Sequence, residues 1–192
     1  MNAQPKPSQL ISESYRKEQE HLHETTNYGT ASVAYAPLVS QIVNKLGVSH
    51  LLDYGCGANV NLAKNLKVGH KVTYQAYDPG VPRYAKDPLP AELVCCIDVL
   101  EHIEPELLDN VLDHLCSLSE ALVFLSIDTG PAVKVLQDGR NAHLIQEPIS
   151  WWLPKIWQRW DLQTVQQSTE TGFYVVATAK PRIEGVDGSA IV

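Results

Sequence analysis

The sequence predicts an α/β fold with a mostly parallel, doubly wound sheet. Residues 50–54, 92–97 and 121–127 are short, nearly continuous apolar runs, which is typical of strands covered on both faces. Segments with a helical spacing of apolar residues lie before and between these runs. Because strands alternate with helices, we expect the strands to pair in parallel. Ligands of such sheets bind outside the carboxyl ends of the strands, so functional residues are expected directly after the strands.

Length and composition indicate one globular domain. The chain has 192 residues, of which 44% are hydrophobic and 19% are charged. No apolar run approaches the ~20 residues that a membrane span needs, and the first residues lack the apolar core of a signal peptide. We therefore expect a cytoplasmic protein without a membrane partner. The net charge of −7 argues against broad binding to a nucleic-acid backbone.

The same patterns assign the elements in chain order. We expect helices at 35–46, at 59–66, from Pro105 onward and after a cap at Ser150, and strands at 50–54, 71–77, 92–97, 121–127, 161–167 and 173–179. The last two strands alternate in polarity and should form an antiparallel hairpin. The chain is thus divided into a polar, partly helical extension (1–30), the main domain (31–180) and a flexible tail (181–192).

The strongest functional signal is a glycine turn after the first strand. Gly55 and Gly57 allow a tight turn and a close approach of the backbone to a ligand. Asp78 ends the next strand, 21 residues after Gly57, where an acid can accept the hydroxyls of a ribose. A dinucleotide is one candidate ligand, but Val60 stands where its fingerprint has a third glycine. An adenosyl cofactor without a pyrophosphate is the other candidate, and Asp53 favours it.

These motifs resemble those of class I S-adenosylmethionine-dependent methyltransferases. The resemblance covers roughly residues 35–180 and rests on Asp53-Tyr54-Gly55-Cys56-Gly57, on Asp78 and on Cys96-Ile97-Asp98-Val99-Leu100-Glu101-His102-Ile103. The last string is similar to the fourth-strand motif of the ubiquinone-biosynthesis-like branch. The resemblance implies a Rossmann-like methyltransferase sheet and S-adenosylmethionine as cofactor. The implied cofactor-binding residues are Tyr28, Asp53, Tyr54, Gly55, Cys56, Gly57, Asp78, Pro79, Ile97 and Asp98.

The resemblance also implies roles for these residues. Asp53 and the glycine backbone would contact the amino acid end of the cofactor, and Asp78 would contact its ribose. Ile97 and Asp98 would lie under the methionine portion. Tyr28 would close over that end from the N-terminal extension.

One stretch departs from the pattern of the family. Only residues 79–91 separate Asp78 from the next strand, and they include four prolines. Such a stretch cannot supply a helix and a further strand, so we expect the third-strand edge of the sheet to be shortened. The adenine would then be held by the loop, with Pro79, Tyr84 and Asp87 as candidates.

The implied function is methyl transfer to an oxygen or nitrogen of a small or nucleotide-like acceptor. An alternative is a module that binds S-adenosylmethionine without turnover and acts in regulation or assembly. Residues 128–150 are expected to form the acceptor wall because they follow the carboxyl end of a strand. In this region we interpret Trp157 and Trp160 as core, whereas Trp151 and Trp152 are candidates for the border of the pocket. Four basic residues could steer an anionic group: Lys134, Arg140, Lys155 and Arg159.

A divalent metal is a further prediction. Asp98, Glu101 and His102 have the i, i+3, i+4 spacing that places three side chains on one side of a helical turn. The string resembles the metal-binding motif of small-RNA 2′-O-methyltransferases and of some ubiquinone-pathway O-methyltransferases. That resemblance implies metal ligation by Glu101, His102 and His143, with His143 in a catalytic role. Alternatively, Glu101 and His102 only shape the turn, and His143 contacts the substrate or belongs to the loop.

Overall fold

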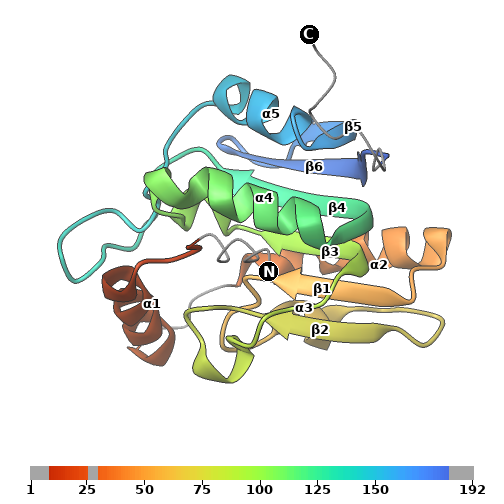
Figure 1. The fold of residues 1–192 in the computed structure, drawn as a ribbon, viewed down its shortest axis with the longest axis horizontal. Helices are drawn as coiled ribbons and strands as arrows, with labels where there is room; N and C mark the ends of the chain where they lie inside the picture. The colour runs from red at the N-terminus through yellow and green to blue at the C-terminus, as the bar shows by residue number, and fades with distance from the viewer. Residues whose placement is uncertain (1–8, 26–29, 182–192) are drawn as a thin grey trace, which may run out of the picture.

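A computed structural model describes residues 9–25 and 30–181 of the chain (Figure 1). These residues form a six-stranded sheet in the order β2-β1-β3-β4-β6-β5. The strands are β1 (His50–Tyr54), β2 (Thr73–Tyr77), β3 (Ala91–Ile97), β4 (Ser119–Asp128), β5 (Trp160–Gln167) and β6 (Gly172–Ala179). Strands β1 to β4 run parallel to one another, and β6 runs antiparallel to both β4 and β5. The predicted parallel sheet with a C-terminal antiparallel hairpin is confirmed.

Helices cover both faces of this sheet (Figure 1). The described helices are α1 (Glu13–Thr25), α2 (Ala31–Leu46), α3 (Asn61–Asn65), α4 (Leu108–Leu118) and α5 (Ile149–Trp157), with short 3₁₀ turns at Pro82–Tyr84, Leu100–His102 and Pro105–Leu107. Helices α4 and α5 pack on one face and α2 and α3 on the other. No helix in the described part of the chain is long and apolar enough to cross a membrane.

The central strands are apolar without interruption because both of their faces are covered. In β3, Val94 and Cys96 point toward α4, whereas Leu93 and Cys95 point toward α2, as the two-residue period of a strand requires. All four side chains are fully buried. Cys95 and Cys96 are therefore core residues.

The stripe on α5 differs from the prediction. Trp152, Ile156 and Trp160 are fully buried, whereas Trp157 is 66% exposed. Trp152 and Ile156 are four residues apart on one side of α5, and Trp157 lies one residue further around the helix; Trp160 is buried as the first residue of β5. The prediction of Trp157 as core was therefore wrong. The helix also begins at Ile149 after Pro148, so Ser150 is not its cap.

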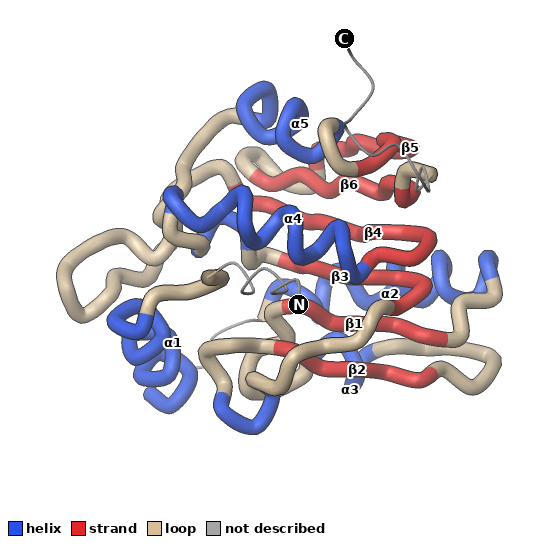
Figure 2. The backbone as a smooth tube through the Cα atoms, viewed as in Figure 1, coloured by secondary structure: helices blue, strands red, loops and turns tan. Residues whose placement is uncertain are grey.

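The sheet of the described residues ends at β2, as the proline-rich stretch predicts. Between β2 and β3 the chain forms a loop with one short helical turn (Figure 2). Residues 9–12 lie on the α4 side, where Asn110 Nδ2 donates to Gln9 O at 3.0 Å and Ser12 N donates to Glu104 Oε2 at 2.8 Å. Helix α1 and the long loop 129–148 both lie where the parallel strands end (Figure 1).

Candidate functional site

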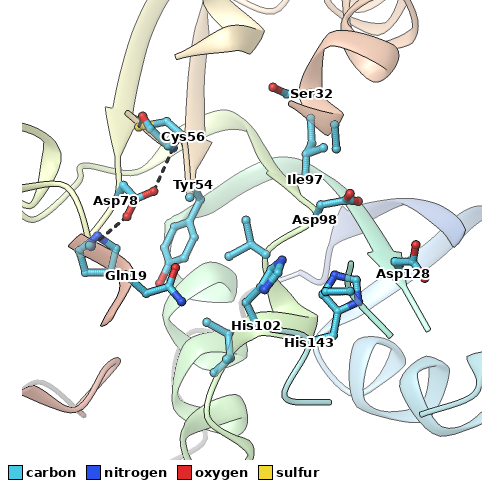
Figure 3. Close-up of a pocket in the computed structure, with 18 of the residues that line it drawn as sticks. Gln19, Ser32, Tyr54, Cys56, Asp78, Ile97, Asp98, His102, Asp128 and His143 are labelled. Atoms are coloured by element: carbon cyan, nitrogen blue, oxygen red, sulfur yellow. Dashed lines mark hydrogen bonds between the residues drawn. The ribbon is translucent and has the colours of Figure 1, made fainter. Parts of the chain in front are cut away.

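A cavity of about 440 Å³ lies at the carboxyl ends of the parallel strands (Figure 3). One part of its wall comes from the glycine turn, Asp78 and the end of β3, and another from His102, His143 and residues 131–134. Helix α1 and the segment before it close a further side. The cavity is large enough for a cofactor-sized ligand. It therefore joins the expected cofactor region to the expected acceptor wall in one space.

The glycine turn is fixed against the end of β2. Gly55 N and Cys56 N donate to Tyr77 O at 2.7 and 3.1 Å. Gly55 and Gly57 have φ values of 79° and 62°, a region that side chains with a Cβ rarely adopt. A Cβ on Gly55 would also lie 2.3 Å from Val99 Cγ2. The turn thus needs glycine at this position for two separate reasons.

Asp78 connects the glycine turn to the loop after β2. Its Oδ2 accepts a hydrogen bond from Gly57 N and its Oδ1 accepts one from Gly80 N, both at 2.9 Å (Figure 3). The carboxylate is 8% exposed and lines the cavity together with Pro79. Tyr84 and Asp87, the other adenine candidates from the loop, do not line it.

Asp53 is a buried carboxyl group at the base of the site. It is 3% exposed, and the Tyr74 hydroxyl donates to its Oδ2. Burial raises the pKa of Asp53 to about 7; the bond from Tyr74 opposes this shift and the nearby Asp78 adds to it. This group therefore changes its charge near neutral pH.

Asp98 adopts a backbone conformation that separates it from the following turn. Its φ is 52°, which is uncommon for a residue other than glycine. Asp98 N donates to Ser126 O and Oγ, both at 3.1 Å, and Ser126 Oγ donates to Asp98 Oδ1 at 3.0 Å. The helical turn begins only at Leu100, so the expectation that Asp98 shares one helical face with Glu101 and His102 was wrong. Burial raises the pKa of Asp98, which lines the cavity beside Ile97.

Glu101, His102 and His143 lie together although 40 residues separate the two histidines in sequence. One ligand atom from each of the three side chains lies within 4.8 Å of the others. The imidazole rings meet edge to face with centroids 4.7 Å apart (Figure 3). Glu101 is fully buried; its Oε1 accepts from Asp128 N at 2.8 Å, and its Oε2 has no hydrogen-bond partner among the described residues. Burial, reinforced by Asp98, raises the pKa of Glu101 well above its usual value.

Backbone carbonyls fix the tautomers of both histidines. His102 Nδ1 lies 2.7 Å from Ala142 O, and His143 Nδ1 lies 2.7 Å from Gly130 O. Because a carbonyl oxygen only accepts, each Nδ1 carries the hydrogen and each neutral ring has its lone pair on Nε2. This arrangement presents two imidazole lone pairs next to one buried carboxyl group.

The loop after β4 positions His143 and carries most of the acceptor side. Asn141 accepts from Ala132 N at 2.9 Å and from His143 N at 2.9 Å, which holds the two ends of the loop together. Lys134 is the one of the four basic candidates that lines the cavity among the described residues. Arg140 pairs with Asp138, Arg159 pairs with Asp109 and Asp113, and Lys155 lies over the Trp151 ring at 4.6 Å.

The tryptophan candidates for the pocket border lie elsewhere. Trp152 is fully buried in the core, and Trp151 packs against the same core cluster. Neither residue lines the cavity among the described residues. Of the two possibilities that the sequence left open for this pair, the structure therefore favours the core.

Sequence reasoning missed the contribution of α1. Tyr15 and Gln19 line the cavity, and the Tyr15 hydroxyl donates to His102 O at 2.6 Å. Tyr15 and Leu22 pack against Leu136 and Ala142 of the long loop. An aromatic residue in an otherwise polar helix was a signal for Tyr15, whereas Gln19 gave none. Tyr28, a predicted cofactor contact, lies outside the described residues.

Comparison with known proteins supports the fold. No protein-family model matches the sequence, and no curated protein matches it. Among solved structures, 1,6-didemethyltoxoflavin-N1-methyltransferase from Burkholderia thailandensis, which holds 1,6-didemethyltoxoflavin and S-adenosylhomocysteine, has a TM-score of 0.59 at 14% identity over 93% of each chain. The N-methyltransferase NodS from Bradyrhizobium japonicum WM9, in complex with S-adenosylhomocysteine, has a TM-score of 0.57 at 10% identity over 85% of this chain and 98% of NodS.

Two further structures resemble the chain. Magnesium protoporphyrin IX methyltransferase from Synechocystis PCC 6803, with bound S-adenosylmethionine, has a TM-score of 0.53 at 15% identity over 94% of this chain and 100% of its own. TnmH has a TM-score of 0.56 at 14% identity, and the match spans only 55% of its length. At these identities the likeness establishes an α/β Rossmann-like fold of the kind found in these methyltransferases.

Proposed function

We propose that the protein is an S-adenosylmethionine-dependent methyltransferase that acts on an oxygen or nitrogen of a small or nucleotide-like acceptor. The observation that carries the proposal is the continuity of one cavity from the glycine turn and Asp78 to His102 and His143. A module that only binds the cofactor has no need of the second half of this cavity. The likeness to structures of O- and N-methyltransferases, several with bound cofactor or product, supports the same conclusion.

In this proposal the residues of the first half hold the cofactor. Asp78 accepts hydrogen bonds from the ribose hydroxyls, and Asp53 with the Gly55 and Gly57 backbone holds the amino acid end. Ile97 and Asp98 support the methionine portion at the end of β3. Tyr54, Cys56 and Pro79 complete the wall. Tyr28 belongs to the proposed set as well.

The reaction requires alignment more than chemical activation. Transfer of a methyl group from a sulfonium proceeds once donor and acceptor are aligned and water is excluded. An acceptor hydroxyl must also lose its proton, and a group with a lone pair near the acceptor can take it. Where no ion is bound, the Nε2 lone pair of His143, which its bond to Gly130 O fixes, suits that role; with an ion bound, the same lone pair would serve as a ligand instead. His143 is therefore the proposed catalytic residue.

A divalent metal at Glu101, His102 and His143 is part of the proposal. Donor atoms around one ion at ~2.0–2.2 Å lie at most ~4.4 Å apart, so the 4.8 Å cluster needs only small side-chain shifts. The buried Glu101 Oε2 has no hydrogen-bond partner among the described residues, and the Nδ1–carbonyl bonds match the outer contacts that orient metal-bound histidines. When bound, such an ion would lower the pKa of an acceptor hydroxyl.

Binding of the cofactor is the first test. We expect calorimetric titration to detect S-adenosylmethionine and S-adenosylhomocysteine but not NAD. Asp78→Ala should weaken binding by ~1.5–3 kcal/mol because hydrogen bonds to a charged acceptor are lost. Asp161→Ala, on the exposed part of β5, is the control and should bind normally. Absence of binding by the folded wild-type protein would refute the proposed function.

Turnover distinguishes an enzyme from a binding module. Metabolite and RNA extracts incubated with the protein and a labelled methyl donor should contain a species that gains one methyl group. A protein that binds the cofactor but labels nothing would favour the regulatory or assembly alternative.

Metal dependence has its own test. We expect excess EDTA to abolish methyl transfer and Mn²⁺, Mg²⁺ or Zn²⁺ to restore it. Calorimetry with the metal alone should detect binding that Glu101→Gln removes, since this change retains the acceptor for Asp128 N but deletes the charge. Glu104→Gln is the matched control, because the Glu104 carboxylate accepts a hydrogen bond from Ser12 N and is not part of the Glu101, His102 and His143 cluster. Full activity in EDTA would remove the metal from the proposal and leave the rest intact.

A further inference from the structure

Helix α1 places in the cavity wall one polar side chain that has no role in the proposed methyl transfer. Gln19 is 8% exposed and lies in the cavity wall near Tyr54 and Asp78 (Figure 3). Its Nε2 is buried and makes no hydrogen bond within the described residues. A buried amide donor without a partner is destabilising, so its presence in a cavity wall points to a ligand that completes it.

The neighbouring Tyr15 does not satisfy this amide. Gln19 is one of the groups that lower the pKa of the Tyr15 hydroxyl, which burial raises overall, so the two side chains lie close together. The Tyr15 hydroxyl nevertheless donates to His102 O at 2.6 Å, and no hydrogen bond of normal geometry joins it to Gln19 Nε2. Gln19 Nε2 thus has no hydrogen-bond partner among the described residues, and a small rotation of this buried side chain would present it to a ligand in the cavity.

Gln19 packs directly against the turn that follows Asp78. A Cβ on Gly80 would lie 2.8 Å from Gln19 Cβ, so only glycine allows α1 to approach this closely. Gly80 N in turn donates to Asp78 Oδ1 at 2.9 Å. The carboxylate of Asp78, which we propose to bind the ribose, therefore contacts the same backbone turn as the Gln19 side chain.

The cavity lining also contains apolar and aromatic side chains that suit a flat ring. They include Leu10 and Ile11 from the N-terminal segment, Tyr54 from β1 and Val111 from α4. From the loop 78–91, only Asp78, Pro79 and Gly80 line the cavity among the described residues. That loop adds no polar side chain beyond Asp78, so Gln19 is the side chain on this wall that is suited to read the polar edge of a base.

We propose that Gln19 recognises the adenine of the cofactor. An amide offers an acceptor and a donor side by side, which matches the 6-amino group of adenine and an adjacent ring nitrogen. In this arrangement Gln19 Oε1 accepts from the 6-amino group and Nε2 donates to the ring nitrogen. The N-terminal helix thereby supplies the base recognition that the shortened sheet edge lacks. The inference rests on the proposed function, because it requires an adenosyl cofactor.

The test compares two ligands and two variants by calorimetry. The ligands are S-adenosylhomocysteine and its analogue in which hydrogen replaces the 6-amino group. Wild-type protein should bind the analogue about tenfold or more weakly. Gln19→Met, which retains the length of the side chain, should bind S-adenosylhomocysteine about ten- to a hundredfold more weakly and should no longer distinguish the two ligands. Lys17→Met, on an exposed position of the same helix, should keep the wild-type values.

The outcomes distinguish a failure of the role of Gln19 from a failure of the proposed function. Equal affinity of wild-type protein for the two ligands, or discrimination that persists in Gln19→Met, would overturn the role of Gln19 while cofactor binding stands. A folded wild-type protein that binds neither S-adenosylhomocysteine nor S-adenosylmethionine would overturn the proposed function and this inference with it. The discrimination measured in wild-type protein is decisive even where Gln19→Met fails to fold.

Discussion

At the scale of single residues, Asp53 links the site to the stability of the fold. Burial raises its pKa to about 7, whereas an aspartate in an unfolded chain titrates near ~3.9. Because the folded-state pKa is the higher one, the folded protein retains a proton that the unfolded chain releases. The stabilisation that protonated Asp53 contributes is complete below its pKa in the unfolded chain. It is lost as the pH rises through its pKa in the folded protein.

We therefore expect the free energy of unfolding of the ligand-free protein to decrease from about pH 4 to about pH 7 and to level off at higher pH. Asp53→Asn keeps the shape of the side chain but cannot ionise, so the part of the slope that Asp53 causes should disappear. Urea unfolding of both proteins across this range measures the difference. Parallel curves for the two proteins would show that Asp53 does not titrate there.

Gly55 allows a second test at this scale, because the cost of backbone strain can be separated from the cost of overpacking against Val99. Gly55→Ala places a side chain at φ 79° and within 2.3 Å of Val99 Cγ2. The backbone strain is worth ~1–2 kcal/mol, and the overpacking typically adds ~1–3 kcal/mol. Gly139→Ala is the control, since its φ is 89° and nothing lies within 4 Å of the added Cβ.

Thermal or urea unfolding should thus show a larger loss for Gly55→Ala than for Gly139→Ala. The double change Gly55→Ala with Val99→Ala should recover part of the overpacking cost. Equal losses in the two single variants would mean that Val99 moves aside freely and that strain alone requires glycine.

At the scale of elements, α1 is held partly by the cavity that it closes. Tyr15 and Gln19 line the cavity, and α1 is otherwise docked through a small apolar cluster with Leu136 and Ala142. A ligand that fills the cavity adds contacts to α1 that are absent in the free protein. Elements with few buried contacts open most readily, so α1 should be among the least protected in the free protein.

We expect hydrogen exchange in α1 to slow on addition of S-adenosylhomocysteine. At about 100 times Kd, binding stabilises the bound state by ~2.7 kcal/mol, and amides that exchange through opening of α1 should gain much of this protection. Helix α5, whose residues do not line the cavity, is the internal control. Unchanged exchange in α1 together with clear ligand binding would indicate that the helix is not part of the closed site.

The elements also show where sequence patterns are informative. Buried strands were predictable because continuous apolar runs and flanking turns encode burial on both faces. The absence of Asp98 from the helical turn was not, because spacing assumes a regular helix and the φ of 52° interrupts it. Trp157 was misassigned because the apolar residues of this short helix allow two different buried sides, one with a spacing of three and one with a spacing of four. Only packing against the sheet decides which side is buried.

At the scale of the whole molecule, topology brings the candidate site together from distant segments. The glycine turn, Asp78 and the end of β3 were predictable because parallel strands end at one edge of the sheet. The meeting of His102 and His143 was anticipated only through a resemblance between motifs. The contact of α1 with His102 could not be predicted, because it spans 87 residues of sequence; the aromatic ring of Tyr15 indicated only that this helix packs against the rest of the chain.

The charge of the molecule yields a last prediction about the cofactor. The chain carries a net charge of −7, and the described lining of the cavity includes Asp53, Asp78, Asp98 and Asp128 against Lys134. This field favours the positively charged sulfonium of S-adenosylmethionine over the neutral sulfur of S-adenosylhomocysteine. Raising ionic strength from 0.1 to 1 M shortens the screening length from about 10 Å to about 3 Å. At a pH above the pKa of Asp53, which burial raises to about 7, calorimetry should therefore show affinity for S-adenosylmethionine falling several-fold more than affinity for S-adenosylhomocysteine. An identical salt dependence for the two ligands would mean that the carboxylates do not act on the sulfonium.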